Sequence, residues 1–592
     1  MEVLRKKLEA CLLILNRNNA ANTNWLNDLC AVLLEFATLA HSLFCSQGES
    51  ECSELVCLCL SQIMICIRQV ESTMKLECGT SVSQVSHQYF LDRIRWCLKR
   101  LMHLYSGESS GEAVAPERSF LKLVDGALDC LAQFTSHSEE NNDISNCPKT
   151  PQEVLPLSQK LRANIDLILG QSLGFANVAL SQDKRALSAL CQKVIRECNA
   201  FQEECKESSS ANYLSTLNLR AMTMEQAIYQ LEDFINDALL RLVFTCFLDF
   251  EKFSVDKIRA LLRNSPDNDD LADEFIADFD VNIDRATQIG IFAISFAPNL
   301  KMKTIMRSCL ASFESLDTTL IPSLQAHGSD LHSDILEQHF NEEVAKFKAT
   351  LQEIIDSRAL LGCCLEILTS GISATEKLFD KQRLEDLVQI SLLLVEHFQL
   401  EVNRKGLSET QNQLGEEYYQ QFIRVLRECK AILMCASQVE PQRILKRFKI
   451  LRTILRKLHG SLGAGKQEEE LPILLAPLLA DDTKGLNEDE TNFSGFKTDR
   501  GGSILYDTER RNRVTRRTDN KLPTNTLDIK SEKTKPNGNV LRRESLRTVM
   551  FKRQNIAESR KLYTSMSNQS TDLQITDILD QLTGMSNGYF EC

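Results

Sequence analysis

The stretch LCQKVIRECNAFQEECK, residues 190–206, places a cysteine at every seventh position. On an α-helix, positions seven residues apart have Cα atoms about 10.5 Å apart. That separation is too long for a disulfide, which needs Cα atoms within about 7 Å, and for a shared zinc ion, whose thiolate ligands must converge. Cys191, Cys198 and Cys205 therefore predict small apolar positions on one face of a helix rather than a reactive site.

The neighbours of these cysteines complete an apolar stripe. Leu187, Val194 and Phe201 alternate with them in steps of four and three, which is the spacing of a helix that packs against other helices. The same periodicity recurs in most segments up to about residue 460, and no strand pattern alternates with it. With 43% hydrophobic residues and only 12 prolines, the sequence predicts an all-α protein made of consecutive antiparallel helical bundles.

Polar breaks divide the 592 residues into four parts. The polar, proline-containing stretch 136–153 predicts the end of an N-terminal helical bundle over residues 1–140. A second helical bundle is expected over 150–265, and a third helical bundle region over 266–460. Residues 461–592 are mostly polar and basic with few periodic apolar positions, which is typical of a disordered tail.

Charge and apolar content exclude several classes of protein. A formal net charge of −13 argues against nucleic acid as a partner, because binders of phosphate backbones need a basic surface. The apolar stretch 55–67 is interrupted by Ser61 and Gln62 and is shorter than the 18 or so residues of a membrane span. The N-terminal apolar run is shorter than a signal sequence requires. We expect a cytoplasmic protein, soluble or peripheral to a membrane.

The sequence offers no convincing site for catalysis, a cofactor or a metal. Its 21 cysteines form no C-x-x-C pair, and its nine histidines show no ligand spacing. GSLGAGK (460–466) has the spacing of a phosphate-binding loop, but Gln467 stands where Ser or Thr should hold magnesium and a basic helix precedes it. A glycine-rich end of a helix explains this segment better. We therefore expect no enzymatic activity and no cofactor.

The helix expected over RILKRFKILRTILRKLHG (443–460) contains no acidic residue. Its apolar seam is Ile444, Phe448, Leu451, Leu455 and Leu458. Its basic residues are candidates for contact with an anionic inner membrane leaflet or an acidic protein surface such as a filament. The alternative is the last helix of a bundle with a basic outer face. The candidate contact residues are Arg443, Lys446, Arg447, Lys449, Arg452, Arg456 and Lys457.

The tail holds a candidate phosphorylation site. Arg542 and Arg543 precede Ser545 in the pattern R-R-x-S that basophilic kinases favour. A phosphate on Ser545 would add nearly two negative charges to a basic segment and weaken its contacts with anionic partners.

Three stretches carry a resemblance to a known family. PLSQKLRANIDLILGQSLGFANVALSQDKRALSALCQKVIRECNAFQEEC (156–205), with Glu197 to Ala200 as its E-C-N-A turn, resembles the helical-bundle repeat of the vinculin and α-catenin family. Residues 231–262 and 275–328 are similar to the bundle that follows in that family. The resemblance implies a non-enzymatic scaffold at the inner face of the plasma membrane that organises actin filaments.

The resemblance also implies partners. These are the actin cytoskeleton, bound directly or indirectly, and a catenin-like or other helical partner. NWLNDLCAVLLEFATLA (24–40) is most similar to an insect member, which implies a role in cellularisation of the early embryo. Family members that bind filaments directly end in a five-helix bundle, whereas the helical pattern here ends near Gly460. A junctional adaptor that binds a partner helix without contacting actin is therefore the alternative.

Overall fold

The computed structural model describes the helical part of the chain. Its described residues are 2–17, 24–47, 53–77, 87–105, 120–135, 151–206, 213–264, 269–297, 299–327, 331–408, 414–435 and 439–462. Within these segments the chain is α-helical with short turns and contains no strand, so the predicted all-α class is confirmed. Except for residues 461 and 462, the tail expected over 461–592 lies outside the described segments. Described residues up to Ile354 form one compact unit and those from Ile355 form a second.

The first group of helices comprises α1 (Glu2–Asn16), α2 (Asn24–Gln47), α3 (Ser53–Glu77) and α4 (Gln88–Tyr105). α1 packs against α2 and α4, and α3 packs against α4. On α4 the buried side chains recur at intervals of three and four: Phe90, Leu91, Ile94, Cys97, Leu98, Leu101 and Tyr105. Such a stripe stabilises the group because each Å² of apolar surface removed from water contributes about 25 cal/mol.

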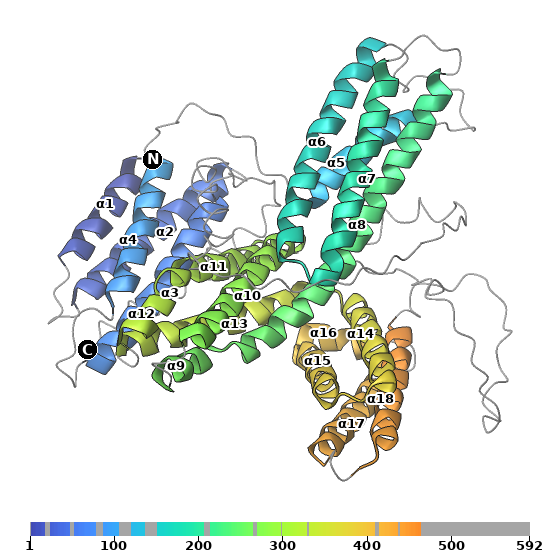
Figure 1. Cartoon of the computed structure of the whole chain (residues 1–592). Helices are drawn as coiled ribbons and strands as arrows, with labels where there is room; N and C mark the ends of the chain where they lie inside the picture. Colours follow the sequence, from blue (N-terminus) through green and yellow to red (C-terminus); the bar gives the residue numbers. More distant parts are fainter. Residues whose placement is uncertain are drawn as a thin grey trace, which may run out of the picture. The chain divides into compact units, whose positions relative to one another are not determined.

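The next four helices, α5 (Phe120–Thr135), α6 (Pro151–Val178), α7 (Ser181–Lys206) and α8 (Tyr213–Lys252), form a closed bundle in which each contacts two others (Figure 1). The predicted stripe of α7 is confirmed, because every member is buried: Leu187, Cys191, Val194, Cys198, Phe201 and Cys205. Asp183 at the start of α7 is also buried and accepts a hydrogen bond from Arg241 of α8, with Nη2 2.9 Å from Oδ1. This pair fixes α7 against α8.

Helix α8 has 40 residues and extends beyond this bundle. Its C-terminal part packs against α10 (Asp269–Phe296), which lies in a group with α9 (Val255–Asn264), α11 (Leu300–Asp317), α12 (Leu320–His327) and α13 (Leu331–Ile354). Phe250 of α8 lies among Phe313, Phe340 and Phe347, with ring centroids 6.3 to 6.5 Å from its own. Two groups of helices therefore share α8 in their cores.

Hydrogen bonds join the first group to α11. Gln62 on α3, only 3% exposed, donates from Nε2 to the Ser308 carbonyl oxygen at 2.9 Å and to the Ser312 hydroxyl at 3.2 Å. Its Oε1 accepts from Arg93 of α4 at 3.1 Å, and Arg93 also donates to the Ala311 carbonyl at 3.2 Å. Because Gln62 is withdrawn from water and Arg93 is half-buried, the loss of one partner leaves the others with a buried polar group to satisfy.

The second unit contains α14 (Ser357–Lys377), α15 (Lys381–Gln399), α16 (Glu401–Ser408), α17 (Leu414–Met434) and α18 (Pro441–Ser461). α14 packs against α15 and α18, and α17 packs against α15 and α18, so the four long helices form a bundle. Asp356 begins α14 as an N-cap, since its carboxylate accepts from the Ala359 amide at 2.8 Å. We call this the α14–α18 bundle.

Some expectations differ from the structure. α5 lies within the N-terminal bundle expected over 1–140, but it packs against α6 and α8 instead. Its Phe134 ring lies 5.2 Å from that of Phe201 on α7. The third region over 266–460 spans parts of both compact units. The four ranges as independent domains remain a proposal.

Three described helices are long and apolar enough to cross a membrane by length and composition: Asn24–Leu43, Glu54–Met74 and Ser357–Lys377. The second includes the stretch 55–67, which was expected from its sequence to be too short for a membrane span. In the structure these helices pack against others of their groups. α3 in particular carries Gln62, whose hydrogen bonds to α11 would be lost in hydrocarbon. Their apolar character is thus used in protein packing here.

Candidate functional site

Helix α18 carries the basic residues that the sequence singled out, and its apolar seam is buried. Ile444, Phe448, Leu451, Leu455 and Leu458 are each at most 1% exposed. α18 packs against α14 and α17, so these buried side chains lie in the interior of that bundle. Since these side chains form the core of the α14–α18 bundle, α18 does not offer them to a membrane. The structure has α18 as a bundle helix with a basic outer face.

That outer face is exposed to solvent. Every candidate contact residue on α18 is exposed except Arg452, which is half-buried. Arg447 pairs with Glu428 of α17 at 3.1 Å, and Lys449 pairs with Glu376 of α14 at 2.5 Å. Exposed pairs of this kind contribute less than about 1 kcal/mol. Among the described residues, the ammonium and guanidinium groups of Lys446, Arg443 and Arg456 form no ion pair.

The same contacts define the direction of α18. Lys449, in the first half of α18, meets Glu376 near the end of α14. His459, near the end of α18, lies beside Gly362 near the start of α14, because a Cβ on Gly362 would be 3.4 Å from the His459 Nε2. α18 is therefore antiparallel to α14. It is also antiparallel to α17, because Arg447 meets Glu428 whereas Lys457 lies 5.9 Å from the Tyr418 ring centroid. The basic face thus runs the whole length of the bundle.

A Ser, a His and an Asn meet inside this bundle. Nε2 of the buried His397 lies 2.9 Å from the Ser357 hydroxyl, and Nδ1 lies 3.3 Å from the Asn403 side-chain nitrogen. That nitrogen also donates to the His397 carbonyl at 3.1 Å, so it is the donor toward Nδ1. Nε2 therefore carries the proton and donates it to Ser357, which is the opposite of what an activated serine needs. The trio is a structural contact between α14, α15 and α16.

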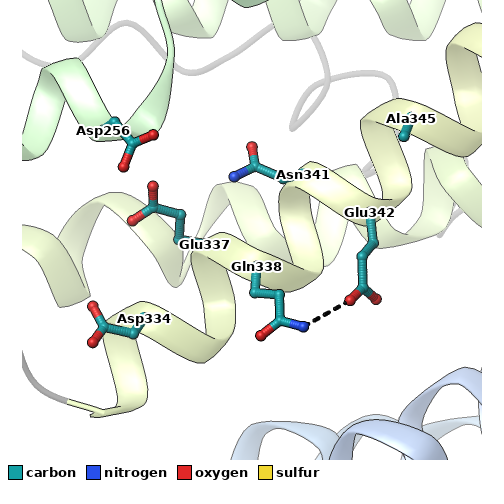
Figure 2. Close-up of a pocket in the computed structure, with 7 residues that line it drawn as sticks. All are labelled: Asp256, Asp334, Glu337, Gln338, Asn341, Glu342 and Ala345. Carbon is teal, nitrogen blue, oxygen red and sulfur yellow. Dashed lines mark hydrogen bonds between the residues drawn. The ribbon is translucent and has the colours of Figure 1, made fainter.

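A shallow pocket lies beside α13 in the first unit (Figure 2). Asp256 faces Glu337 across it, and burial together with their shared hydrogen bond raises the pKa of Glu337. Arg259 binds the same cluster, with Nη2 2.5 Å from Glu337 and Nη1 2.6 Å from Asp334. The arginine offsets the acidic charge, so the pocket is a structural ion-pair cluster. Its lining is Asp256, Asp334, Glu337, Gln338, Asn341, Glu342 and Ala345.

The cysteines behave as packing residues. In the described part of the chain every free cysteine is buried except Cys435. Burial raises the pKa of Cys191 and of Cys205 to about 11, which keeps both thiols protonated at neutral pH. Among the described residues, no group of three or more His, Cys, Asp or Glu side chains is arranged to hold a metal ion. Ser545 and Lys466 lie outside the described residues.

Comparison with known proteins decides the family. Residues 1–515 match the model described as Serendipity locus alpha protein (SRY-A). The chain belongs to the Serendipity locus alpha protein family. Serendipity locus protein alpha of Drosophila subobscura is 35% identical over 492 residues, which is 79% of this chain and 86% of that protein. The Drosophila virilis protein is 36% identical over 489 residues, or 77% and 87% of the two chains.

The chain also shares its fold with a solved structure of a vinculin homolog from a sponge. The TM-score is 0.50 at 11% identity, over 79% of this chain and 60% of that chain. The predicted resemblance to the vinculin and α-catenin family is thereby confirmed for the helical-bundle fold.

Sequence reasoning missed one surface of the α14–α18 bundle. Leu378 and Phe379 between α14 and α15, and Met434 at the end of α17, are exposed apolar side chains. They interrupt or end the helical stripes, so periodicity gave no signal for them. Only the folded bundle shows that they lie at the surface.

Proposed function

We propose that this protein is a non-enzymatic cytoskeletal scaffold that organises cortical actin at the inner face of the plasma membrane, during cellularisation of the early insect embryo. The observation that supports it most is the basic face of α18. Its lysines and arginines lie at the surface of the bundle while its apolar seam is buried in the core. The basic face is therefore available to an acidic partner without any unfolding.

Electrostatics supports an acidic partner. The chain as a whole carries a formal net charge of −13, yet α18 holds no Asp or Glu. A local basic face on an acidic protein attracts anionic filaments or lipid while the remaining surface repels them, which favours one orientation of binding. The fold adds support, because the sponge vinculin homolog is described in connection with cell adhesions.

Phosphorylation of Ser545 in the tail is a separate proposal. We place Ser545 in a basic segment, behind Arg542 and Arg543, where phosphorylation would reduce attraction to an acidic partner. Replacing Ser545 with Asp should weaken binding in the same direction as raised salt, whereas Ser545→Ala should leave it unchanged.

Co-sedimentation with filamentous actin tests the proposal. We expect the full-length chain to pellet with filaments and the double variant Lys446→Glu, Arg456→Glu to remain in the supernatant. Lys160→Glu with Arg185→Glu is the matched control, because these exposed residues lie on α6 and α7 in the other unit. Repeating the assay without residues 463–592 separates the α18 face from the tail.

The assay also addresses the alternative of a junctional adaptor. If the full-length chain does not pellet with actin alone but does so after addition of cortical extract, the link to actin is indirect. If it pellets under neither condition while binding an isolated partner helix, the adaptor function holds and the actin proposal is wrong.

A further inference from the structure

One end of the α14–α18 bundle exposes large apolar side chains. Leu378 is 78% exposed, Phe379 38% and Met434 81%. Leu378 and Phe379 form the corner between α14 and α15, and Met434 is the last residue of α17. Large apolar side chains grouped at one place on a surface commonly mark a site of interaction.

The ion pairs of α18 show that these three residues lie at the same end. Lys449 meets Glu376, so the corner after α14 lies near the level of Lys446 on the antiparallel α18. Arg447 meets Glu428, so Met434 lies near the level of Pro441. Five residues of helix separate the two levels, which is about 7.5 Å along the bundle axis. We call Leu378, Phe379 and Met434 the apolar end.

Basic side chains surround the apolar end. Arg443 and Lys446 lie between the two levels just derived, and Lys377 directly precedes Leu378. All three are exposed, and among the described residues none of them forms an ion pair. The acidic groups nearby are partly compensated: Glu376 pairs with Lys449, and Asp380 caps α15 through the Arg383 amide. Glu440 is exposed as well, and the balance remains positive.

We propose that the apolar end is a docking surface for an anionic phospholipid bilayer, into whose headgroup region Leu378, Phe379 and Met434 insert. The inference names the surface through which the protein would contact the plasma membrane, and it rests on the proposed function only for the location of the protein at that membrane. Apolar side chains enter the boundary between headgroups and acyl chains to a depth of about 5–10 Å, while basic side chains stay at the charged surface. The offset between the corner and Met434 fits within that depth.

Charge and shape favour lipid over a protein partner. The exposed apolar side chains stand at the tip of a bundle, beside lysines and arginines. To dock into a groove of a protein partner, a helix of this bundle would have to present a continuous apolar face. The apolar seam of α18 cannot serve as that face, because it is already buried in the bundle core. A bilayer needs only a few inserted side chains together with basic residues at its surface.

A fluorescent probe at Cys435 tests insertion directly. Cys435 adjoins Met434 and is exposed, whereas the other described cysteines are buried. In the full-length chain, Cys45, Cys52, Cys78, Cys147 and Cys592, whose side chains lie outside the described ones, are first replaced with Ser. An environment-sensitive dye on Cys435 should shift to the blue with vesicles of phosphatidylcholine and phosphatidylserine, and remain unchanged with phosphatidylcholine alone.

Two matched double variants separate insertion from adsorption. Leu378→Gln with Met434→Gln should weaken binding to the anionic vesicles at least about tenfold, as expected from loss of two inserted apolar side chains. Val402→Gln with Leu414→Gln is the control, because both residues are exposed at the opposite end of the bundle. Unchanged helicity by circular dichroism confirms that each variant is folded.

Several outcomes would overturn the inference. They are the absence of a blue shift with anionic vesicles, equal binding by the apolar-end variant and the wild type, or equal loss in both double variants. Loss of binding only on charge reversal at Arg443 and Lys446 would show adsorption without insertion and would also overturn it. Because no actin is present, failure here leaves the actin assay of the proposed function unaffected.

Discussion

Lys449 on α18 contacts Glu376 near the end of α14, with Nζ and Oε1 2.5 Å apart. The pair is exposed and adds little stability by itself. The pair shows the orientation of the amphipathic helix, because Lys449 lies on the outer face while Phe448, the preceding residue, is 0% exposed in the bundle core. The basic helix is thus part of a folded bundle.

The role of the seam leads to a stability prediction. Phe448→Ala should lower the free energy of unfolding of the α14–α18 bundle by about 3–5 kcal/mol, because it removes a fully buried ring and leaves a cavity. Lys449→Ala should change it by less than about 1 kcal/mol. Urea denaturation followed by circular dichroism measures both values. Equal stability of Phe448→Ala and the wild type would contradict a buried seam.

Gln62 predicts a similar effect in the first unit. Gln62→Leu removes the acceptor of the Arg93 Nε and the donor to Ser308, so buried polar groups of α4 and α11 lose a partner. We expect a loss of about 1–3 kcal/mol. Gln133→Leu, on the exposed face of α5, is the control and should be nearly neutral. If both changes have equal effects on the unfolding midpoint, the network contributes no more than a surface amide does.

The periodicity of apolar residues predicted most of the fold. The stripe through Cys191, Cys198 and Cys205 identified the buried face of α7. The residues of the α18 seam are buried as well, although their pattern left open whether they face a membrane or a bundle core. Gly362 and Gly371 lie inside α14, although glycine is a poor helix former. In the fold Gly371 makes room for Leu387, since a Cβ there would lie 2.8 Å from its side chain.

Contacts distant in sequence could not be predicted in this way. Gln62 and its partner Ser308 are 246 residues apart, and no local pattern pairs α3 with α11. The basic residues of α18 could be proposed as a contact site from the sequence, because a run of Lys and Arg on one helix is a local signal. The apolar end could not be predicted from the sequence, because it forms only when folding brings the ends of α14 and α17 to the same end of the bundle.

The cysteine stripe gives a chemical prediction. Cys191→Ala, Cys198→Ala and Cys205→Ala together should lower stability modestly, by about 1 kcal/mol per site, and leave the metal content unchanged. Because burial raises the pKa of these thiols, iodoacetamide should modify them slowly in the native chain and quickly in urea. Mass spectrometry of the alkylated chain measures both rates. Rapid native alkylation, or loss of bound zinc in the triple variant, would contradict a packing role.

His397 predicts a pH dependence of stability. Burial lowers its pKa from 6.5 to about 4. The unfolded chain binds a proton below pH 6.5 while the folded chain does not, so stability is full above that value and is lost as the pH falls toward 4. At pH 5 the loss should be about 2 kcal/mol. Thermal melts at pH 7 and pH 5 should show a smaller difference for His397→Gln, and an unchanged difference would refute the assignment.

The central claim is that the outward basic face of α18 anchors a cytoskeletal scaffold at the cell cortex. Fluorescently tagged full-length chain, imaged in living cells together with a filament marker, tests it most directly. We expect the wild type and the control Lys160→Glu, Arg185→Glu to concentrate with cortical actin. Lys446→Glu with Arg456→Glu should be evenly distributed in the cytoplasm. Unchanged cortical enrichment of that folded variant would contradict the account.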